Sequence, residues 1–301
     1  MLTCSRGQGA AMNYIFLNLK RFDIQPEHGG INTLAPMATW ASTIAGALNE
    51  GLEGRATLVR DCGFAAFFPE AHLLAAAEAT PPSGLLRICC QGVHHADVAK
   101  GGNFGAFTSL RTASAAKELG CSWTLIGHSE ERACKAEMMK LAGADDESIA
   151  RATNELLNRE LRCAARAGLK IVYCIGEKAE ELPDRVKVLT RQVREGLSGM
   201  DPSKIVLAYE PIWAIGPGKT PPTAEQIASI AAEIKKIAPC PLVYGGGLKK
   251  ENAASIGAIA DLDGGLIALT RFSGAIGFYP DEYLEIVDAY CQGRGAAGGK
   301  A

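Results

Sequence analysis

The sequence has almost no excess charge and no long apolar run. Its 301 residues hold 31 Lys and Arg against 33 Asp and Glu, a net charge of −2, and like charges do not cluster. Without a basic patch, the chain has no electrostatic footprint for nucleic acid or for an anionic membrane surface. Its apolar stretches are interrupted by Gly, Pro or charged residues well before the ~20 apolar residues that a membrane-spanning helix needs. The composition therefore predicts a soluble protein that binds neither nucleic acid nor membranes.

The first residues also lack the sustained apolar segment of a secretory signal. A chain of this length does not need its ten cysteines as disulfide staples, and several of them, such as Cys89 and Cys174, lie inside apolar runs. We therefore expect reduced thiols and a cytoplasmic location. Met12 stands directly before the first strand-like run, which suggests a disordered extension over residues 1–11. The Gly-rich tail, residues 292–301, suggests disorder as well.

Short apolar runs alternate with helical patterns along the whole chain, which indicates an α/β protein with a parallel sheet covered by helices. Eight such units in about 250 residues predict a single (β/α)8 barrel over residues 12–291. No Pro- or Ser-rich linker divides the chain, which favours one domain. The expected strands are Tyr14–Leu19, Phe64–Phe68, Leu85–Cys90, Trp123–Ile126, Lys170–Cys174, Ile205–Tyr209, Pro241–Tyr244 and Leu266–Leu269.

Two segments are longer than a strand-to-helix connection needs. The stretch 132–168 has room for two helices, which we place near Cys134–Leu141 and Asp146–Ala167, and a further helix is expected over Ala224–Ile237. The stretch Arg21–Asn32 follows the first strand as an enlarged loop. Loops at the carboxyl ends of barrel strands form the active site, so this loop is expected to shape the pocket.

Polar residues at the ends of the apolar strands are the main functional signal. Asn18 and Lys20 end the first strand at spacing i, i+2, which points both side chains to one face. His128 leaves the fourth strand through a Gly and precedes a helix, whose N-terminal dipole is expected to depress the imidazole pKa and keep it neutral. Glu177, at the end of the fifth strand, is expected to have a structural role.

The sixth strand ends in a carboxylate, Glu210, followed by a loop that begins with Pro and ends with Gly and Lys. An apolar loop of this kind is typical of a lid that excludes water from a site. Desolvation under the lid would make the carboxylate a stronger base. After the seventh strand, Tyr244 is followed by three glycines, whose backbone N–H groups can approach a phosphate closely.

Together these segments resemble the triosephosphate isomerase family, and the resemblance extends from the first strand to the eighth. It rests on Asn18-x-Lys20, Gly105-Ala106-Phe107-Thr108, Gly127-His128-Ser129-Glu130, Cys174-Ile175-Gly176-Glu177, the lid from Tyr209 to Lys219, and Tyr244-Gly245-Gly246. The resemblance implies a TIM barrel and an aldose–ketose isomerase of glycolysis and gluconeogenesis. The implied reaction interconverts dihydroxyacetone phosphate and D-glyceraldehyde 3-phosphate without a metal or an organic cofactor.

The resemblance also implies a role for each matched catalytic residue. Glu210 would move a proton between two carbons through an enediolate, and neutral His128 would move protons between the two oxygens. Lys20 and Asn18 would stabilise the developing negative charge. The implied supporting residues are Glu130 as a partner of Lys20, Tyr209 and Tyr244 beside the lid, Gly216 for phosphate in the closed lid, and Thr108 as the residue that completes the neighbouring site of a homodimer.

The phosphate end departs from the family pattern. Gly246 and Gly247 are expected to bind phosphate, with Gly247 in the place of a Ser, but Ala268 and Leu269 replace a Gly pair after the eighth strand. Side chains there would crowd the phosphate, and Arg271 is a candidate replacement cation. Leu19, Leu110 and Glu131 also differ from the family, the last two at positions that resemble a salt bridge across the dimer interface.

These departures leave alternatives open. A related isomerase acting on a four-carbon erythrulose phosphate needs the same acid–base residues and differs only in the shape of its pocket. A non-catalytic sugar-phosphate-binding barrel would keep the fold, but it would have no need to keep the four catalytic residues together. A Schiff-base aldolase is disfavoured, because the sixth strand ends in a glutamate.

Overall fold

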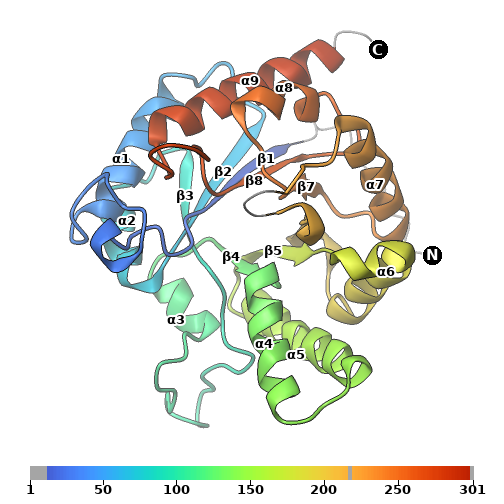
Figure 1. Ribbon diagram of the computed structural model, residues 1–301. Helices are drawn as coiled ribbons and strands as arrows, with labels where there is room; N and C mark the ends of the chain where they lie inside the picture. The colour runs from blue at the N-terminus through green and yellow to red at the C-terminus, as the bar shows by residue number, and fades with distance from the viewer. Residues whose placement is uncertain (1–11, 216–218, 299–301) are drawn as a thin grey trace.

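Eight parallel strands pair in chain order and close into a barrel in the computed structural model, which describes residues 12–215 and 219–298 (Figure 1). The closure is made by β1, which pairs with β2 on one side and with β8 on the other. The strands are β1 (Asn13–Asn18), β2 (Cys62–Phe68), β3 (Leu86–Cys90), β4 (Trp123–Ile126), β5 (Lys170–Ile175), β6 (Ile205–Tyr209), β7 (Leu242–Tyr244) and β8 (Gly264–Ile267).

Helices surround the barrel, and the last one, α9, lies along α8 and α1 (Figure 1). The α-helices are α1 (Trp40–Glu53), α2 (Leu73–Glu78), α3 (Ala113–Glu118), α4 (Ser129–Leu141), α5 (Asp146–Arg166), α6 (Arg185–Gly196), α7 (Ala224–Ile237), α8 (Lys250–Gly257) and α9 (Pro280–Gly298). Short 3-10 turns are η1 (Pro26–His28), η2 (Glu70–His72), η3 (Ala179–Asp184), η4 (Pro202–Lys204) and η5 (Ile212–Ala214). Among the described residues, no helix combines the length and apolar character that crossing a membrane requires.

The core has two parts because side chains alternate along each strand. Outward residues such as Ile15 and Leu17 pack against the helices, whereas Phe16 between them points into the barrel. Inside the barrel, Phe16 contacts Trp123 edge to face, with their ring centroids 5.3 Å apart. The other members of the inner cluster are Ala65, Phe67, Cys89, Leu125, Val172, Cys174, Val206, Ala208, Val243 and Leu266.

The expected single barrel is confirmed. The strands lie close to their predicted positions except the eighth, which was placed at Leu266–Leu269 and in fact begins at Gly264. Helix α7 has the predicted bounds, and the long fourth connection holds two helices as expected, α4 and α5. The enlarged loop after β1 contains η1.

The C-terminal segment is placed differently from the sequence expectation. Helix α9 continues to Gly298, so the expected boundary after residue 291 falls inside a helix and residues 292–298 are helical. Its glycines allow close packing: a Cβ on Gly293 would lie 2.0 Å from the Ala254 oxygen of α8. The expected extension 1–11 lies outside the described residues.

Candidate active site

A cavity of about 530 Å³ opens at the carboxyl end of the barrel, where the inner face of several strands becomes polar. Asn18 lies two residues beyond the inward Phe16, and Glu210 lies two residues beyond the inward Ala208. The strand alternation therefore carries both side chains to the barrel mouth. Asn18 lines the cavity together with Lys20, His128 and Glu130, which come from two different strand ends.

Lys20 occupies a strained backbone conformation at this mouth. Its φ of 43° lies in the left-handed region, which a residue with a side chain rarely adopts outside functional sites. The side chain of Asn18 accepts a hydrogen bond from the Lys20 N–H at 3.1 Å, which holds the turn. The Lys20 ammonium then lies 2.6 Å from Glu130 Oε1 at the start of α4. Lys20 thus brings a cation into the cavity, with its position set from both sides.

His128 and Glu210 contact each other across the mouth. The imidazole Nε2 lies 3.0 Å from Glu210 Oε1, and the other carboxylate oxygen accepts the Ser129 N–H at 3.0 Å. His128 is also the N-cap of α4, where its Nδ1 accepts the Glu130 N–H at 3.3 Å. Since Nδ1 acts as an acceptor, the neutral imidazole carries its proton on Nε2, directed at Glu210.

The pKa of His128 is raised, in contrast to the expectation from the helix dipole. Burial disfavours the charged imidazole, but the charge and hydrogen bond of the Glu210 carboxylate outweigh it and raise the His128 pKa. Glu210 itself is only 2% exposed. The sequence argument missed this effect because it considered the helix following His128 without the carboxylate from β6.

Glu177 connects the residues at the start of the lid through hydrogen bonds to one carboxylate oxygen. Its carboxylate is fully buried, and Oε1 accepts hydrogen bonds from Tyr209 at 2.9 Å, from the Trp213 indole at 2.9 Å and from Arg185 at 2.8 Å. Trp213 lies in η5, within the lid. The structural role expected for Glu177 is therefore a specific one, since it fixes the lid in the position seen here.

The glycines after β7 are required by close packing. A Cβ on Gly246 would lie 2.3 Å from the Tyr244 hydroxyl and 2.6 Å from Pro211, the first residue of the lid. Tyr244 donates to the Gly246 carbonyl at 3.0 Å. Gly247 has a φ of 92°, a conformation that suits Gly better than the Ser of the family pattern. Gly216, the proposed phosphate ligand in the lid, lies outside the described residues.

The end of β8 does not place Arg271 in the cavity. Its guanidinium pairs with Glu282 of α9, with Nε 2.9 Å from the carboxylate, and stacks on the Tyr279 ring at 4.0 Å. The prediction that Arg271 supplies a cation for the phosphate is therefore wrong for this structure. Ala268 and Leu269 directly follow the strand and are half-buried, but neither lines the described cavity.

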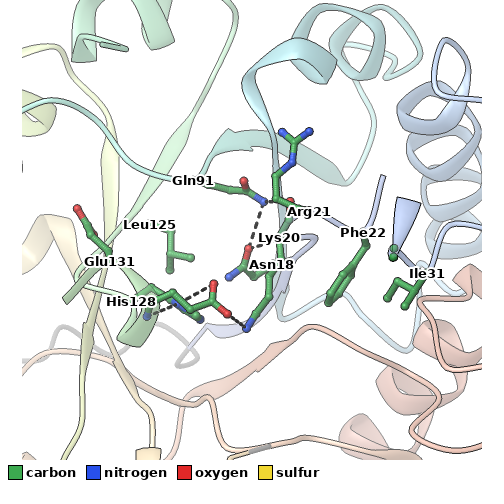
Figure 2. A pocket seen from close by; sticks show the side chains of 12 residues that line it. Asn18, Lys20, Arg21, Phe22, Ile31, Gln91, Leu125, His128 and Glu131 are labelled. Atoms are coloured by element: carbon green, nitrogen blue, oxygen red, sulfur yellow. Dashed lines mark hydrogen bonds and ion pairs between the residues drawn. The ribbon is translucent and has the colours of Figure 1, made fainter. Parts of the chain in front are cut away.

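The enlarged first loop forms one wall of the cavity, as its length suggested. Phe22, Gly29, Gly30 and Ile31 line it, and Figure 2 shows Phe22 and Ile31 on one side of Lys20, with Leu125 and Glu131 on the other. The backbone approaches itself closely here, because a Cβ on Gly30 would lie 2.0 Å from the Ile24 oxygen. The loop therefore has a defined shape, and its side chains occupy space beside Lys20 that would otherwise be part of the cavity.

Gln91 was missed by the sequence analysis. Its side-chain amide donates to Asn18 Oδ1 at 3.3 Å and to the Lys20 carbonyl at 3.0 Å, so it braces both residues (Figure 2). Gln91 stands two residues beyond the inward Cys89, the same offset that brings Asn18 and Glu210 to the mouth. Strand alternation was therefore a signal that could have found it.

Thr108 lies apart from these residues, in an exposed segment between β3 and α3. Phe104 in the same segment is 91% exposed, and Leu110 is exposed as well. Within residues 12–215 and 219–298, no group of three or more His, Cys, Asp or Glu side chains is arranged to hold a metal ion.

Comparisons with known proteins agree with this geometry. A family model described as "Triosephosphate isomerase" matches residues 41–288. A triosephosphate isomerase of Chlorobium phaeobacteroides is 38% identical over 184 residues, covering 57% of this chain and 68% of the relative. Another, of Chlorobaculum tepidum, is 34% identical over 271 residues, covering 86% and 96%. The crystal structure of triosephosphate isomerase from Bartonella henselae has the same fold, with a TM-score of 0.67 at 24% identity, covering 92% of this chain and 98% of that one.

Proposed function

The chain belongs to the triosephosphate isomerase family, and we propose that it interconverts dihydroxyacetone phosphate and D-glyceraldehyde 3-phosphate. The observation that carries the proposal is the contact of 3.0 Å between His128 Nε2 and Glu210 Oε1, at a cavity that Lys20 and Asn18 also line. The reaction needs a base, a proton donor for oxygen and a fixed cation. The barrel brings one residue of each kind to the same mouth.

Glu210 is the proposed base. Its carboxylate removes the proton from the carbon beside the substrate carbonyl and returns it to the neighbouring carbon. To do so it must turn away from His128 and from the Ser129 N–H, which hold it in the position seen here. The surrounding burial leaves few waters to compete for the carboxylate once the lid covers the substrate.

His128 and Lys20 are the proposed partners of the substrate oxygens. The Nε2 proton of His128 is positioned to polarise a carbonyl and to pass between the two oxygens of the enediolate. Lys20 supplies positive charge to the same oxygens and to the phosphate, and Asn18 supplies a hydrogen-bond donor. Glu130 and Gln91 hold this pair in place.

The lid and the glycine segment are proposed to bind the phosphate. Backbone N–H groups at Gly246, Gly247 and Gly216 are suited to the phosphate oxygens. Ala268 and Leu269 follow β8 at positions where the family has glycines, and only their backbone N–H groups are proposed to contribute, because neither side chain lines the cavity. Arg271 is left out of this proposal because it pairs with Glu282.

A homodimer is also proposed. Its support is the exposed segment around Thr108, in which Phe104 is 91% exposed and Leu110 is 48% exposed, an apolar surface suited to a second copy of the chain. Light scattering after size exclusion tests it: we expect twice the chain mass, and a Phe104→Asp variant should shift toward the monomer.

A cytoplasmic location remains a prediction from the sequence.

A second candidate substrate is an erythrulose phosphate. The observation that favours it is the cavity wall that Phe22 and Ile31 of the enlarged first loop form beside Lys20. A four-carbon ketose phosphate would react through the same base and imidazole, so the residues of the mechanism would be unchanged.

One coupled assay tests both substrates. Purified protein is given glyceraldehyde 3-phosphate and, in parallel, erythrulose 1-phosphate and erythrulose 4-phosphate, and kcat/KM is compared. We expect a triose value within ~10⁴–10⁸ M⁻¹s⁻¹, the range of efficient enzymes. A weak triose rate beside a strong tetrulose rate would transfer the proposal to the second substrate. No reaction with any of the three would favour a binding protein.

A further inference from the structure

The turn that presents His128 is held on both sides of one residue, Gly127, through its N–H and its carbonyl. The Gly127 N–H donates to Glu131 Oε2 at 2.6 Å, and the Gly127 carbonyl accepts from Arg132 Nε at 2.9 Å. Gly127 has a φ of 79°, and a Cβ on it would lie 2.9 Å from the Cys174 oxygen. Two consecutive residues of α4 therefore fix a turn that only Gly can form without strain.

This turn sets the position of both reacting groups. His128 follows Gly127 directly and contacts Glu210 through Nε2, and the next residue, Ser129, donates its N–H to the same carboxylate. A rotation of the Gly127 peptide would therefore displace the imidazole and the anchor of the base together. We call the pair of contacts from Glu131 and Arg132 to Gly127 the clamp. Arg132 donates hydrogen bonds to Asn154 and Tyr173 as well, so the Arg132 side of the clamp is rigid.

The hold of Glu131 on Gly127 depends on a cluster of two acids and one base, in which Glu160 is buried and Glu131 and Lys135 are partly buried. Glu131 Oε1 lies 2.7 Å from Lys135 Nζ, and the same ammonium lies 2.9 Å from Glu160 Oε1 on α5. Glu160 is 3% exposed, and its Oε2 has no hydrogen-bond donor among the described residues. If both carboxyl groups were ionised, the cluster would hold an uncompensated negative charge in a buried position.

We propose that Glu131 is a positioning residue for the catalytic imidazole, and that Glu160 keeps Glu131 in place by retaining a proton and donating it in a hydrogen bond. This inference rests on the proposed function, since it concerns the same reaction. Glu131 acts through the Gly127 N–H and needs no contact with substrate. Its carboxylate then satisfies three donors at once: the Gly127 amide, the Lys135 ammonium and the Glu160 carboxyl.

The electrostatics support this division of roles. Burial and the neighbouring Glu131 charge raise the pKa of Glu160 to about 9, so its proton is retained at neutral pH. Burial opposes ionisation of Glu131 as well, but hydrogen bonds from Glu160, Lys135 and Gly127 together with the Lys135 charge lower its pKa. The other titratable or charged groups around the cluster are Arg132 from α4, Arg159 from α5, Tyr173 and Cys174 from β5, and His95 after β3.

An alkaline pH dependence follows. Above about pH 9 Glu160 loses its proton, so that the hydrogen bond to Glu131 is replaced by repulsion between two carboxylates. The Lys135 ammonium cannot neutralise both. The hold on Gly127 weakens, and kcat should fall over this range while KM changes little, because the Glu131 carboxylate bonds Gly127 and Lys135 and none of the residues proposed to bind the substrate, although Glu131 lines the cavity.

The test compares Glu131→Gln, Glu160→Gln and a control, Asp263→Asn. Asp263 is matched in chemistry: its Oδ2 binds an ammonium, Lys235 at 2.5 Å, and a backbone N–H, Leu242 at 2.9 Å, but at the opposite end of the barrel. For each variant, kcat and KM for glyceraldehyde 3-phosphate are measured between pH 6 and pH 10. The His128 imidazole is followed by NMR, and the melting temperature shows whether the protein is folded.

We expect Glu131→Gln to lower kcat about ten-fold with KM nearly unchanged, and to shift the His128 resonances. Gly127 and Lys135 donate to different oxygens of Glu131, and an amide offers an oxygen at only one of these two positions and carries no charge for Lys135. Glu160→Gln imitates the protonated acid, so it should match the wild type at pH 7.5 and lose the decline in kcat above pH 9. Asp263→Asn should lower the melting temperature without changing kcat or the His128 resonances.

Unchanged kcat and unchanged His128 resonances in a folded Glu131→Gln variant would overturn the proposal. If Glu131→Gln does not fold, Glu160→Gln decides, because an alkaline decline equal to that of the wild type would also overturn it. An inactive wild-type protein would refute the proposed function instead. The His128 resonances would still test the positioning role of Glu131 in that case.

Discussion

His128 and Glu210 share a hydrogen bond of 3.0 Å although their strands, β4 and β6, are separated in the barrel by β5. The contact pairs the proposed proton donor for oxygen with the proposed base for carbon. Both groups are thereby held at one point of the mouth. A substrate carbonyl must replace Glu210 as the partner of the imidazole N–H before the carboxylate can act as a base. Several measurable consequences come from this pairing and from the contacts around it.

Shortening the base should lower the rate far more than the stability. In Glu210→Asp the carboxylate is withdrawn by one methylene, and a displacement of this size costs on the order of 10²-fold in rate. The measurement is kcat for glyceraldehyde 3-phosphate beside a thermal melt. We expect a melting temperature close to that of the wild type. A variant with the wild-type kcat would remove Glu210 from the role of base.

The pKa of His128 should fall when Glu210 loses its charge. Burial and the Lys20 charge lower the pKa of this imidazole, and Glu210 raises it, so Glu210→Gln leaves only the Glu130 charge to oppose burial. An NMR titration of His128 should give a raised pKa in the wild type and a lower pKa in the variant. Equal values in the two proteins would contradict the pairing.

The same pair makes stability depend on pH. Because the folded pKa of His128 is raised, the pair contributes stability that is fully present below the unfolded value of 6.5 and is lost as the pH rises through the folded value. The difference in unfolding free energy between the wild type and Glu210→Gln should therefore shrink as the pH rises above 6.5. Denaturant unfolding at a series of pH values measures it.

The lid should loosen when the Trp213 indole loses its partner. Trp213→Phe keeps the ring but removes the hydrogen bond of 2.9 Å to Glu177, worth about 1 kcal/mol. This corresponds to a roughly five-fold higher population of the released lid. Trypsin cleavage after Lys219 should accelerate by a similar factor. Tyr279→Phe, which removes a hydroxyl contact to Ala275, serves as the control and should leave this cleavage unchanged.

A methyl group at Gly246 should disturb the segment that leads to the lid. In Gly246→Ala the new Cβ would lie 2.3 Å from the Tyr244 hydroxyl, so the tyrosine or Pro211 must move. We expect a lower melting temperature and a loss of activity. The control is Gly46→Ala in α1, where a Cβ meets no atom within 4 Å and should stabilise the helix by about 0.5–1 kcal/mol.

Two cysteines at the other end of the barrel should form a disulfide under mild oxidation. The sulfurs of Cys62 and Cys291 lie 3.8 Å apart, and a hydrogen bond from Cys62 lowers the pKa of Cys291, which favours the attacking thiolate. Hydrogen peroxide would take two electrons and two protons from the pair and yield water. We expect a mass loss of two hydrogens on the peptide pair 62/291 and a melting temperature several degrees higher.

Cys62→Ser should abolish both effects of peroxide. The activity of the oxidised wild type should be unchanged, because the cysteines lie at the start of β2 and in α9, away from the barrel mouth. The exposed Cys134 shows whether the oxidation is selective, since its thiol should remain free at the dose that joins the pair. A peptide map in which the two cysteines stay reduced would refute this prediction.

The sequence was most informative where the alternation of side chains along a single strand is enough to predict which residues point into the barrel mouth. The offset of two residues carries Asn18 and Glu210 from the apolar interior to the mouth, and this could be read without a structure. Gln91 follows the same rule, two residues beyond the inward Cys89, but a neutral amide after two cysteines carries no acid–base signal of its own. The paired Lys20 and Glu130 were suggested only through the family resemblance.

Contacts between distant segments account for what the sequence left unpredicted. The eighth strand was expected to begin at Leu266, yet β8 begins at Gly264, which lies so close to β1 that a Cβ on it would be 1.8 Å from the Tyr14 oxygen. The tail from residue 292 was expected to be disordered from its glycine content alone, whereas α9 packs its glycines against α8. Arg271 was assigned to phosphate, since nothing in the local sequence indicates that Glu282 receives it.

The pairing of β1 with β8 has a consequence for the order of folding. Tyr14 pairs with Gly264, so the first strand keeps an open edge throughout synthesis until nearly the whole chain has left the ribosome. Asn18 and Lys20, which depend on β1, therefore reach their final positions late. A nascent chain arrested before residue 264 should bind chaperones through this edge and show no isomerase activity, so the catalytic centre is assembled by the last strand to be translated.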